Sequence, residues 1–129
     1  MAHILLIDDD ELLRGVLAKA LEHHGHSVTQ AGDGRLGVEL ARATKFDVVI
    51  TDLVMPVQEG VETILMLRRE HARLPIIAIS GGVSNSGLYL DIAARIGAQK
   101  VLAKPFMPQD LVRAIDQVLR GEADSPPAG

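Results

Sequence analysis

Four short apolar runs most constrain the fold of this chain, because each is too short for an ordinary helix and each is followed by a polar side chain. The runs, each given with the residues that follow it, are 4–7 with Asp8 and Asp9, 48–51 with Asp52, 76–79 with Ser80, and 101–103 with Lys104. Apolar runs without polar alternation are typical of strands that are buried on both faces of a parallel sheet.

Longer amphipathic segments separate these runs and predict helices. The first is expected over residues 10–24, where Asp10 can cap the start and Gly25 can end the helix. Its apolar residues recur at helical spacing: Leu12, Leu13, Val16, Leu17, Ala20 and Leu21. Further helices are expected after Gly34, over 59–71, over 86–96 and from about Pro108, and an edge strand is expected over 27–31.

Strands that alternate with helices predict a doubly wound α/β fold, a five-stranded parallel sheet flanked by five helices. Ligands of such folds bind at the carboxyl ends of the strands, so the polar residues after the runs are expected to share one site. The length fits one domain over residues 1–120. Residues 121–129 are polar and contain proline, which predicts a flexible tail or the start of a linker.

Composition and charge argue against several classes of protein. The net charge is −4 and Lys and Arg do not cluster, which argues against direct binding to nucleic acid. No apolar run approaches the roughly 18 residues of a membrane span, and the start does not resemble a secretory signal, so a soluble, cytoplasmic protein is expected. The absence of cysteine excludes disulfides and thiolate chemistry.

The residue types at the predicted site suit phosphoryl chemistry. Three carboxylates, those of Asp8, Asp9 and Asp52, would repel one another at close range unless a cation lay among them. Mg²⁺ prefers oxygen ligands and commonly joins carboxylates to a phosphate. The Lys104 ammonium could stabilise charge on a transferring phosphoryl group.

These motifs together resemble the receiver domain of bacterial two-component response regulators, of the chemotaxis-regulator type. The resemblance covers roughly residues 3–120. It rests on the pair Asp8-Asp9, the segment Asp52-Leu53-Val54-Met55-Pro56 with the later Gly60, Ser80, and Lys104-Pro105-Phe106. It implies a flavodoxin-like strand order, 2-1-3-4-5.

The resemblance also implies a role for each residue. Asp52 would accept a phosphoryl group from the phosphohistidine of a histidine kinase or a phosphotransfer protein. Mg²⁺ would be held by Asp9, by Asp8 largely through water, by Asp52 and by the Val54 carbonyl. Lys104 and the Ser80 hydroxyl would contact the phosphoryl oxygens. Structural support would come from Met55, Pro56, Gly60 and Pro105, with a cis Lys104–Pro105 bond.

A receiver of this kind is a signalling switch rather than an enzyme, and it would act as a monomer or weak dimer on an unidentified protein target. Many family members carry Tyr or Phe three residues before the lysine, where this chain has Val101. Output is therefore expected to depend on ordering of the glycine-containing segment from Ser80 to Gly87.

Two alternatives share parts of this pattern. The acids after the first run also fit a haloacid-dehalogenase-like phosphatase with Asp8 as nucleophile, although the later acidic pair of that class is missing. An FMN-binding flavodoxin would need a hydroxyl- and glycine-rich loop where this chain is acidic. The neighbouring His23, His24 and His26 have no clear ligand spacing and are expected to be solvated at a helix end.

Overall fold

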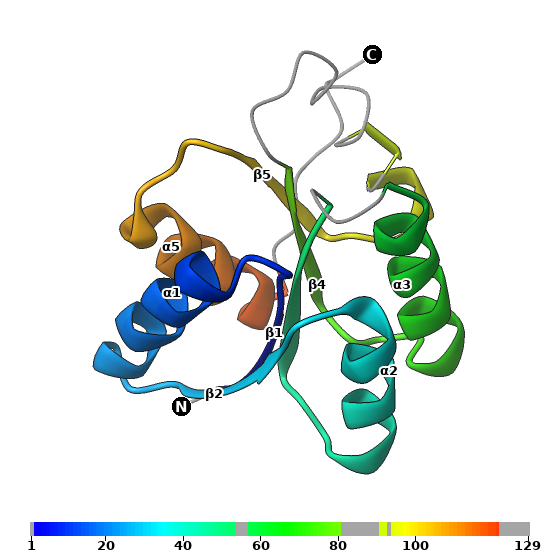
Figure 1. The fold of residues 1–129 in the computed structure, drawn as a ribbon, viewed down its shortest axis with the longest axis horizontal. Coiled ribbons are helices and arrows are strands. Elements are labelled where there is room, and N and C mark those ends of the chain that lie inside the picture. Colours follow the sequence, from blue (N-terminus) through cyan, green and yellow to red (C-terminus); the bar gives the residue numbers. More distant parts are fainter. Residues whose placement is uncertain (1, 54–56, 81–90, 93, 122–129) are drawn as a thin grey trace.

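The computed structural model describes residues 2–53, 57–80, 91, 92 and 94–121. Its elements, in chain order (Figure 1), are β1 (His3–Ile7), α1 (Glu11–His23), β2 (Ser27–Ala31), α2 (Gly34–Ala43), β3 (Val48–Asp52), α3 (Val57–Glu70), β4 (Ile76–Ser80), β5 (Lys100–Ala103) and α5 (Pro108–Leu119). Residues 91, 92 and 94–96 are helical and belong to the fourth of the five predicted helices.

The five strands form one parallel sheet in the order β2-β1-β3-β4-β5, which confirms the predicted fold class and strand order. The chain begins inside the sheet, runs out to β2 at one edge, and then crosses back to β3 and onward to β5. The strand order therefore reverses beside β1, where α/β folds of this type place their ligand sites. No helix in the described part of the chain is long and apolar enough to cross a bilayer.

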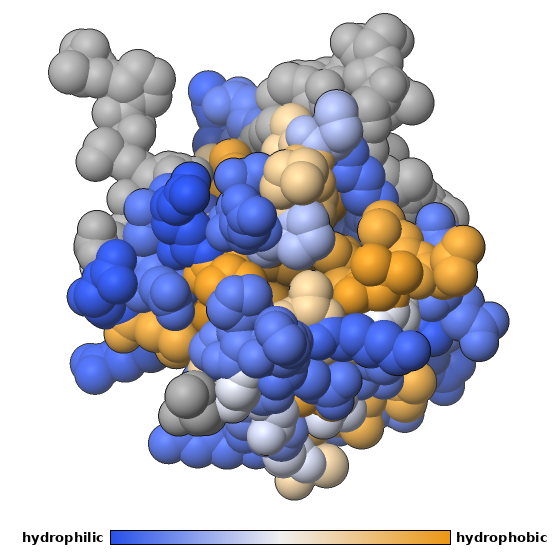
Figure 2. Space-filling view, turned by 90° about the vertical axis from the view of Figure 1, so that its left-hand side faces the viewer, coloured by the Kyte–Doolittle hydropathy of each residue, from blue (hydrophilic) through white to orange (hydrophobic). Residues whose placement is uncertain are grey.

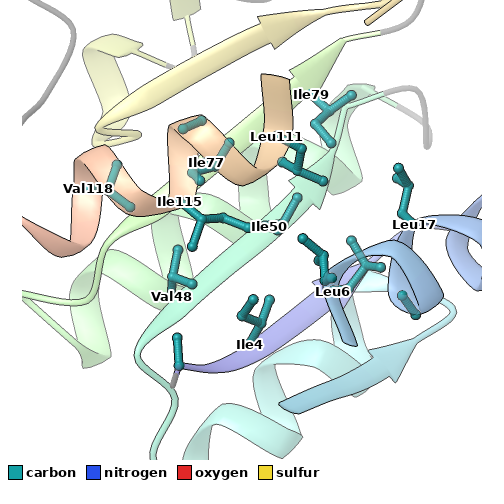
Figure 3. Close-up of a cluster of buried hydrophobic side chains, with 14 residues drawn as sticks. Ile4, Leu6, Leu17, Val48, Ile50, Ile77, Ile79, Leu111, Ile115 and Val118 are labelled. Atoms are coloured by element: carbon teal, nitrogen blue, oxygen red, sulfur yellow. The ribbon is translucent and has the colours of Figure 1, made fainter. Parts of the chain in front are cut away.

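The sheet is covered on both faces, which explains why its central strands are apolar throughout (Figure 1). On one face, α2 and α3 pack over a buried cluster that includes Leu5, Val49 and Ile64. On the other face, α1 and α5 pack over a cluster that includes Ile50, Leu17 and Ile115 (Figure 3). Alternate residues of one strand thus enter different cores, and both cores hold the strand ends in place.

Local signals set the ends of α1 as predicted. The Asp10 carboxylate accepts a hydrogen bond from the Leu13 amide at 3.0 Å, which confirms Asp10 as the N-terminal cap. After the helix, Gly25 has a φ of 91°, a conformation that favours glycine. The observed helix, Glu11–His23, lies within one residue of the predicted bounds at each end.

Only part of the apolar repeat of α1 is buried. The residues buried against the sheet are Leu17, Ala18 and Leu21, whereas Leu12 is 80% exposed and Val16 is 52% exposed. Figure 2 shows the side of the molecule formed by α1 and α5, where apolar side chains reach the surface between hydrophilic ones. Leu12 and Val16 belong to the same helical repeat as the buried residues but stay exposed, because only one side of this helix meets the sheet.

Candidate functional site

The predicted site residues lie at the carboxyl ends of neighbouring strands. Asp8 directly follows β1, Asp52 ends β3, Ser80 ends β4, and Lys104 directly follows β5. Since β1, β3, β4 and β5 are consecutive neighbours in the sheet, these residues share one edge of it. The strands bring together positions that are far apart in the sequence.

An ion pair joins two of these residues directly. The Lys104 ammonium donates a hydrogen bond to Oδ2 of Asp52 at 2.7 Å. The Lys104 amide also donates to the Ser80 carbonyl at 2.8 Å, which ties the end of β4 to the residue after β5. Ser80 and Asp52 are both buried, and the Lys104–Pro105 peptide bond is cis, as predicted.

Asp8 is buried beside Asp52. Its Oδ1 accepts a hydrogen bond from the Asp10 amide at 2.9 Å, while its buried Oδ2 has no hydrogen-bond partner in the described part of the chain. Burial raises the pKa of Asp8 to about 7 and is the largest influence on it. The Asp10 amide opposes this rise in pKa, whereas the nearby Asp52 carboxylate adds to it.

A bound cation would compensate the negative charge around the buried Asp8 carboxylate. The unpartnered Oδ2 and the raised pKa of Asp8 both show that negative charge is poorly compensated here, and carboxylate oxygens are the donors that Mg²⁺ prefers. The donor chemistry therefore fits Mg²⁺. Asp9 is exposed, and no three acidic or histidine side chains of the described residues alone form a metal-binding group. The Val54 carbonyl lies outside the described residues, so the ligand set remains a prediction.

The supporting residues are only partly described. At Gly60 of α3, an added Cβ would lie 3.0 Å from Cδ2 and 3.3 Å from Cα of Leu53, the residue after Asp52. Gly60 therefore permits the close approach of α3 to this segment, as predicted. Pro105 is exposed, and Met55 and Pro56 lie outside the described residues.

The structure also shows a site residue that sequence reasoning missed. The guanidinium of Arg14, on α1, donates to the Asp8 carbonyl at 2.6 Å and to Oε1 of Gln30 at 3.0 Å. An arginine that binds a main-chain oxygen and an amide leaves no charge pattern in the sequence, because neither partner is an acid. The only feature of the sequence that could have pointed to Arg14 was its place on the helix that follows the acidic residues.

The histidine cluster contributes nothing to this edge of the sheet. His23 and His24 are exposed, as predicted, but His26 is only partly exposed and its Nδ1 accepts a hydrogen bond from the Ala2 amide at 3.3 Å. The prediction of a solvated side chain is therefore wrong for His26, which helps to hold the start of β1.

Sequence and structure comparisons place this geometry in a known family. A family model described as the response regulator receiver domain matches residues 4–116. The chain therefore belongs to the receiver domains of two-component response regulators, and the motif-based prediction is confirmed.

Individual relatives agree with this family. Protein PilH of Pseudomonas aeruginosa is 36% identical over 123 residues, which cover 94% of this chain and 100% of PilH. The crystal structure of the chemotaxis protein CheY4 of Vibrio cholerae superposes with a TM-score of 0.81 at 31% identity, over 92% of this chain and 98% of that one.

Other relatives are longer than this chain. The transcriptional regulatory protein CseB of Streptomyces avermitilis is 34% identical over 126 residues, which cover 96% of this chain but 52% of CseB. The chain thus spans about half the length of that relative.

Proposed function

We propose that Asp52 accepts a phosphoryl group from a histidine kinase or a histidine phosphotransfer protein, and that this modification switches the conformation of the domain. The observation that carries the proposal is the ion pair between Lys104 and Asp52, because it places a fixed ammonium 2.7 Å from an oxygen of the proposed acceptor. Asp8 lies close enough to the same carboxylate to interact with it electrostatically.

The proposed phosphoryl transfer uses the Asp52 carboxylate and the Lys104 ammonium. A carboxylate oxygen of Asp52 forms a bond to phosphorus while the bond between phosphorus and the imidazole nitrogen of the donor breaks. The donor histidine keeps the electron pair of that bond and takes up a proton from solvent if it leaves as an anion. Lys104 can move from the carboxylate to the phosphoryl oxygens, where positioning and charge stabilisation supply most of the catalysis.

The metal would be held by Asp9, by Asp52 and by the Val54 carbonyl, with Asp8 acting largely through water. When bound there, Mg²⁺ would neutralise charge on the carboxylates and on the phosphoryl oxygens. The unpartnered, buried Oδ2 of Asp8 supports a cation at this place. Asp8 would then lose the proton that its raised pKa favours in the metal-free protein.

The switch itself would use Ser80. Phosphorylation gives Asp52 extra negative charge and strong acceptor oxygens, by analogy with hydroxyl phosphorylation. Ser80 directly follows Ile79, which pairs with Asp52 across β3 and β4, so we take its hydroxyl as the donor to the phosphoryl group. At Val101 of β5 the partly buried side chain packs against the core under α2 and α3, and it has no ring that could change position. Within the segment 80–87, whose ordering is predicted to carry the output, residues 81–87 lie outside the described residues.

The test is to locate the phosphoryl group. The protein is treated with acetyl phosphate and Mg²⁺, and the aspartyl phosphate is reduced with borohydride and mapped by peptide mass spectrometry. We expect modification at Asp52 and none in Asp52→Asn. Modification at Asp8 instead would favour the phosphatase alternative, against which the family and the pairing of Lys104 with Asp52 both argue.

The remaining features are proposals that follow from the family. The chain would act as a signalling switch rather than on a separate substrate, and its location would be cytoplasmic, where it would meet the donor. It would act on a downstream protein as a monomer or weak dimer. The curated relatives include proteins named as transcriptional regulators, but this chain matches only about half of CseB.

A further inference from the structure

Arg14 connects three elements at the edge of the sheet that carries the site. It lies on α1, and its Nη1 donates to the main-chain carbonyl of Asp8 at the end of β1 at 2.6 Å. Its Nε donates to Oε1 of Gln30, on the neighbouring β2, at 3.0 Å. The planar guanidinium can make both contacts at once, whereas a lysine ammonium would act as a single point donor.

The Asp8 carbonyl belongs to the peptide that joins the two acids. That peptide is planar, so the direction of the carbonyl also sets the direction of the Asp9 amide and limits the position of Asp9. On its other side, the Asp8 amide donates to the Ala31 carbonyl of β2 at 3.1 Å. Arg14 thus completes the restraints on the main chain around Asp8.

The carboxylates of Asp8 and Asp9 need a main chain that is held in place. The Asp8 side chain is buried next to Asp52, and its Oδ2 has no partner among the described residues, an arrangement that costs free energy in the metal-free protein. Rotation of the Asp8–Asp9 peptide would change the positions of both carboxylates. A hydrogen bond from the charged guanidinium to the carbonyl opposes that rotation.

We infer that Arg14 is a positioning residue of the metal site, which holds the Asp8–Asp9 peptide and thereby limits where the two carboxylates lie relative to Asp52. This inference rests on the proposed function, because it assumes the proposed Mg²⁺ site. Arg14 acts through the main chain and contacts neither the phosphoryl group nor the metal. Groups that orient metal ligands commonly change metal affinity by about 10- to 100-fold when they are removed.

The experiment compares the whole chain with Arg14→Met, Arg14→Lys and the control Arg35→Met. Arg35 lies on α2, and its side chain is 91% exposed. The Mg²⁺ dissociation constant is measured by NMR titration without phosphorylation. We expect Arg14→Met to raise it about tenfold, Arg14→Lys to raise it less, and Arg35→Met to leave it unchanged. In metal-free buffer, the Asp9 amide resonance should move in Arg14→Met and not in the control.

A purely structural role would lower thermal stability equally with and without Mg²⁺, whereas a positioning role also reduces the increase in Tm that Mg²⁺ produces. Unchanged Mg²⁺ affinity in folded Arg14→Met would overturn the inference alone. If that variant does not fold, Gln30→Leu removes the second partner of the guanidinium and should weaken Mg²⁺ binding by a smaller factor; unchanged affinity there overturns the inference as well. Absence of Mg²⁺ binding by the unmodified chain would overturn the proposed site itself.

Discussion

The ammonium of Lys104 lies 2.7 Å from Oδ2 of Asp52, in an ion pair whose carboxylate side is almost completely buried. The two side chains are 22% and 2% exposed, respectively. The carboxylate therefore depends on a protein cation rather than on water for its compensation. This dependence makes the pair important both for stability and for the proposed transfer.

Lys104→Met is expected to destabilise the metal-free protein at neutral pH. Removing one partner of a buried pair leaves an uncompensated charge and typically costs about 3–5 kcal/mol, and the partial exposure of Lys104 favours the lower end of this range. The free energy of unfolding from urea titration measures the effect. The same change at Arg113, which pairs with Asp110 at 3.7 Å on the surface, should cost less than about 1 kcal/mol.

The double variant Asp52→Asn with Lys104→Met separates the pair from other effects of the substitution. Removal of both charges should recover much of the stability lost in Lys104→Met. If the two single effects simply add in the double variant, the ion pair does not account for the loss.

Sequence reasoning recovered β1, β3 and β4 well because these central strands are buried along almost their whole length and are therefore mostly apolar. The grouping of Asp8, Asp52, Ser80 and Lys104 was predictable for a related reason, since a parallel sheet places the carboxyl ends of its strands at one edge. Helical spacing alone did not show which face of α1 is buried, where Leu12 is exposed and Ala18 is buried. Alanine carries a weak hydrophobic signal, and periodicity alone does not show how wide a helix face the sheet covers.

Arginines with main-chain partners were also beyond prediction. Arg14 binds the Asp8 carbonyl, and Arg68 of α3 donates to the carbonyls of His71, Ala72 and Gly97. Neither pattern of contacts includes a carboxylate. Such partners are set by the three-dimensional path of the chain, which a motif does not contain.

The raised pKa of Asp8 predicts an unusual dependence of stability on pH in metal-free buffer. Its pKa rises from an ordinary value of 3.8 to about 7 on folding, chiefly through burial. Between these values the folded protein binds more protons than the unfolded chain, so the contribution to stability is complete below pH 3.8 and is lost as pH rises through about 7. The free energy of unfolding should fall across this range relative to Asp8→Asn.

The difference between the two proteins is the quantity to measure, because the other titrating groups are shared. Mg²⁺ should restore stability above pH 7 by binding the charged form, and its affinity should weaken as pH falls below 7. Parallel stability curves for the two proteins in metal-free buffer would contradict the assignment of this pKa to Asp8.

Two glycines in helices are expected to respond in opposite ways to alanine. At Gly15 of α1 no atom lies within 4 Å of an added Cβ, so Gly15→Ala should stabilise the protein by about 1 kcal/mol through helix propensity. At Gly37 of α2 the added Cβ would collide with the Ile7 side chain in the core. Gly37→Ala should therefore destabilise the protein, and thermal unfolding of both variants tests the contrast.

We expect a protein phosphodonor to contact the exposed apolar residues of α1. Leu12 lies in the first turn after the acids at the site edge and is 80% exposed, and Val16 lies one turn further along the helix. A donor that brings a phosphohistidine to Asp52 must approach this edge and can bury both side chains. Small donors such as acetyl phosphate would need no such contact.

The double substitution Leu12→Gln with Val16→Gln should therefore slow phosphorylation by the kinase about tenfold, which corresponds to a loss of about 1.4 kcal/mol of contact free energy. The kinase is first chosen as the fastest donor in a purified panel. Phosphorylation by acetyl phosphate should stay unchanged, and so should transfer to Leu65→Gln, an exposed position of α3 on the opposite face of the sheet. Equal slowing with both donors would show that the substitutions disturb the site itself, and an unchanged rate with the kinase would place the contact elsewhere.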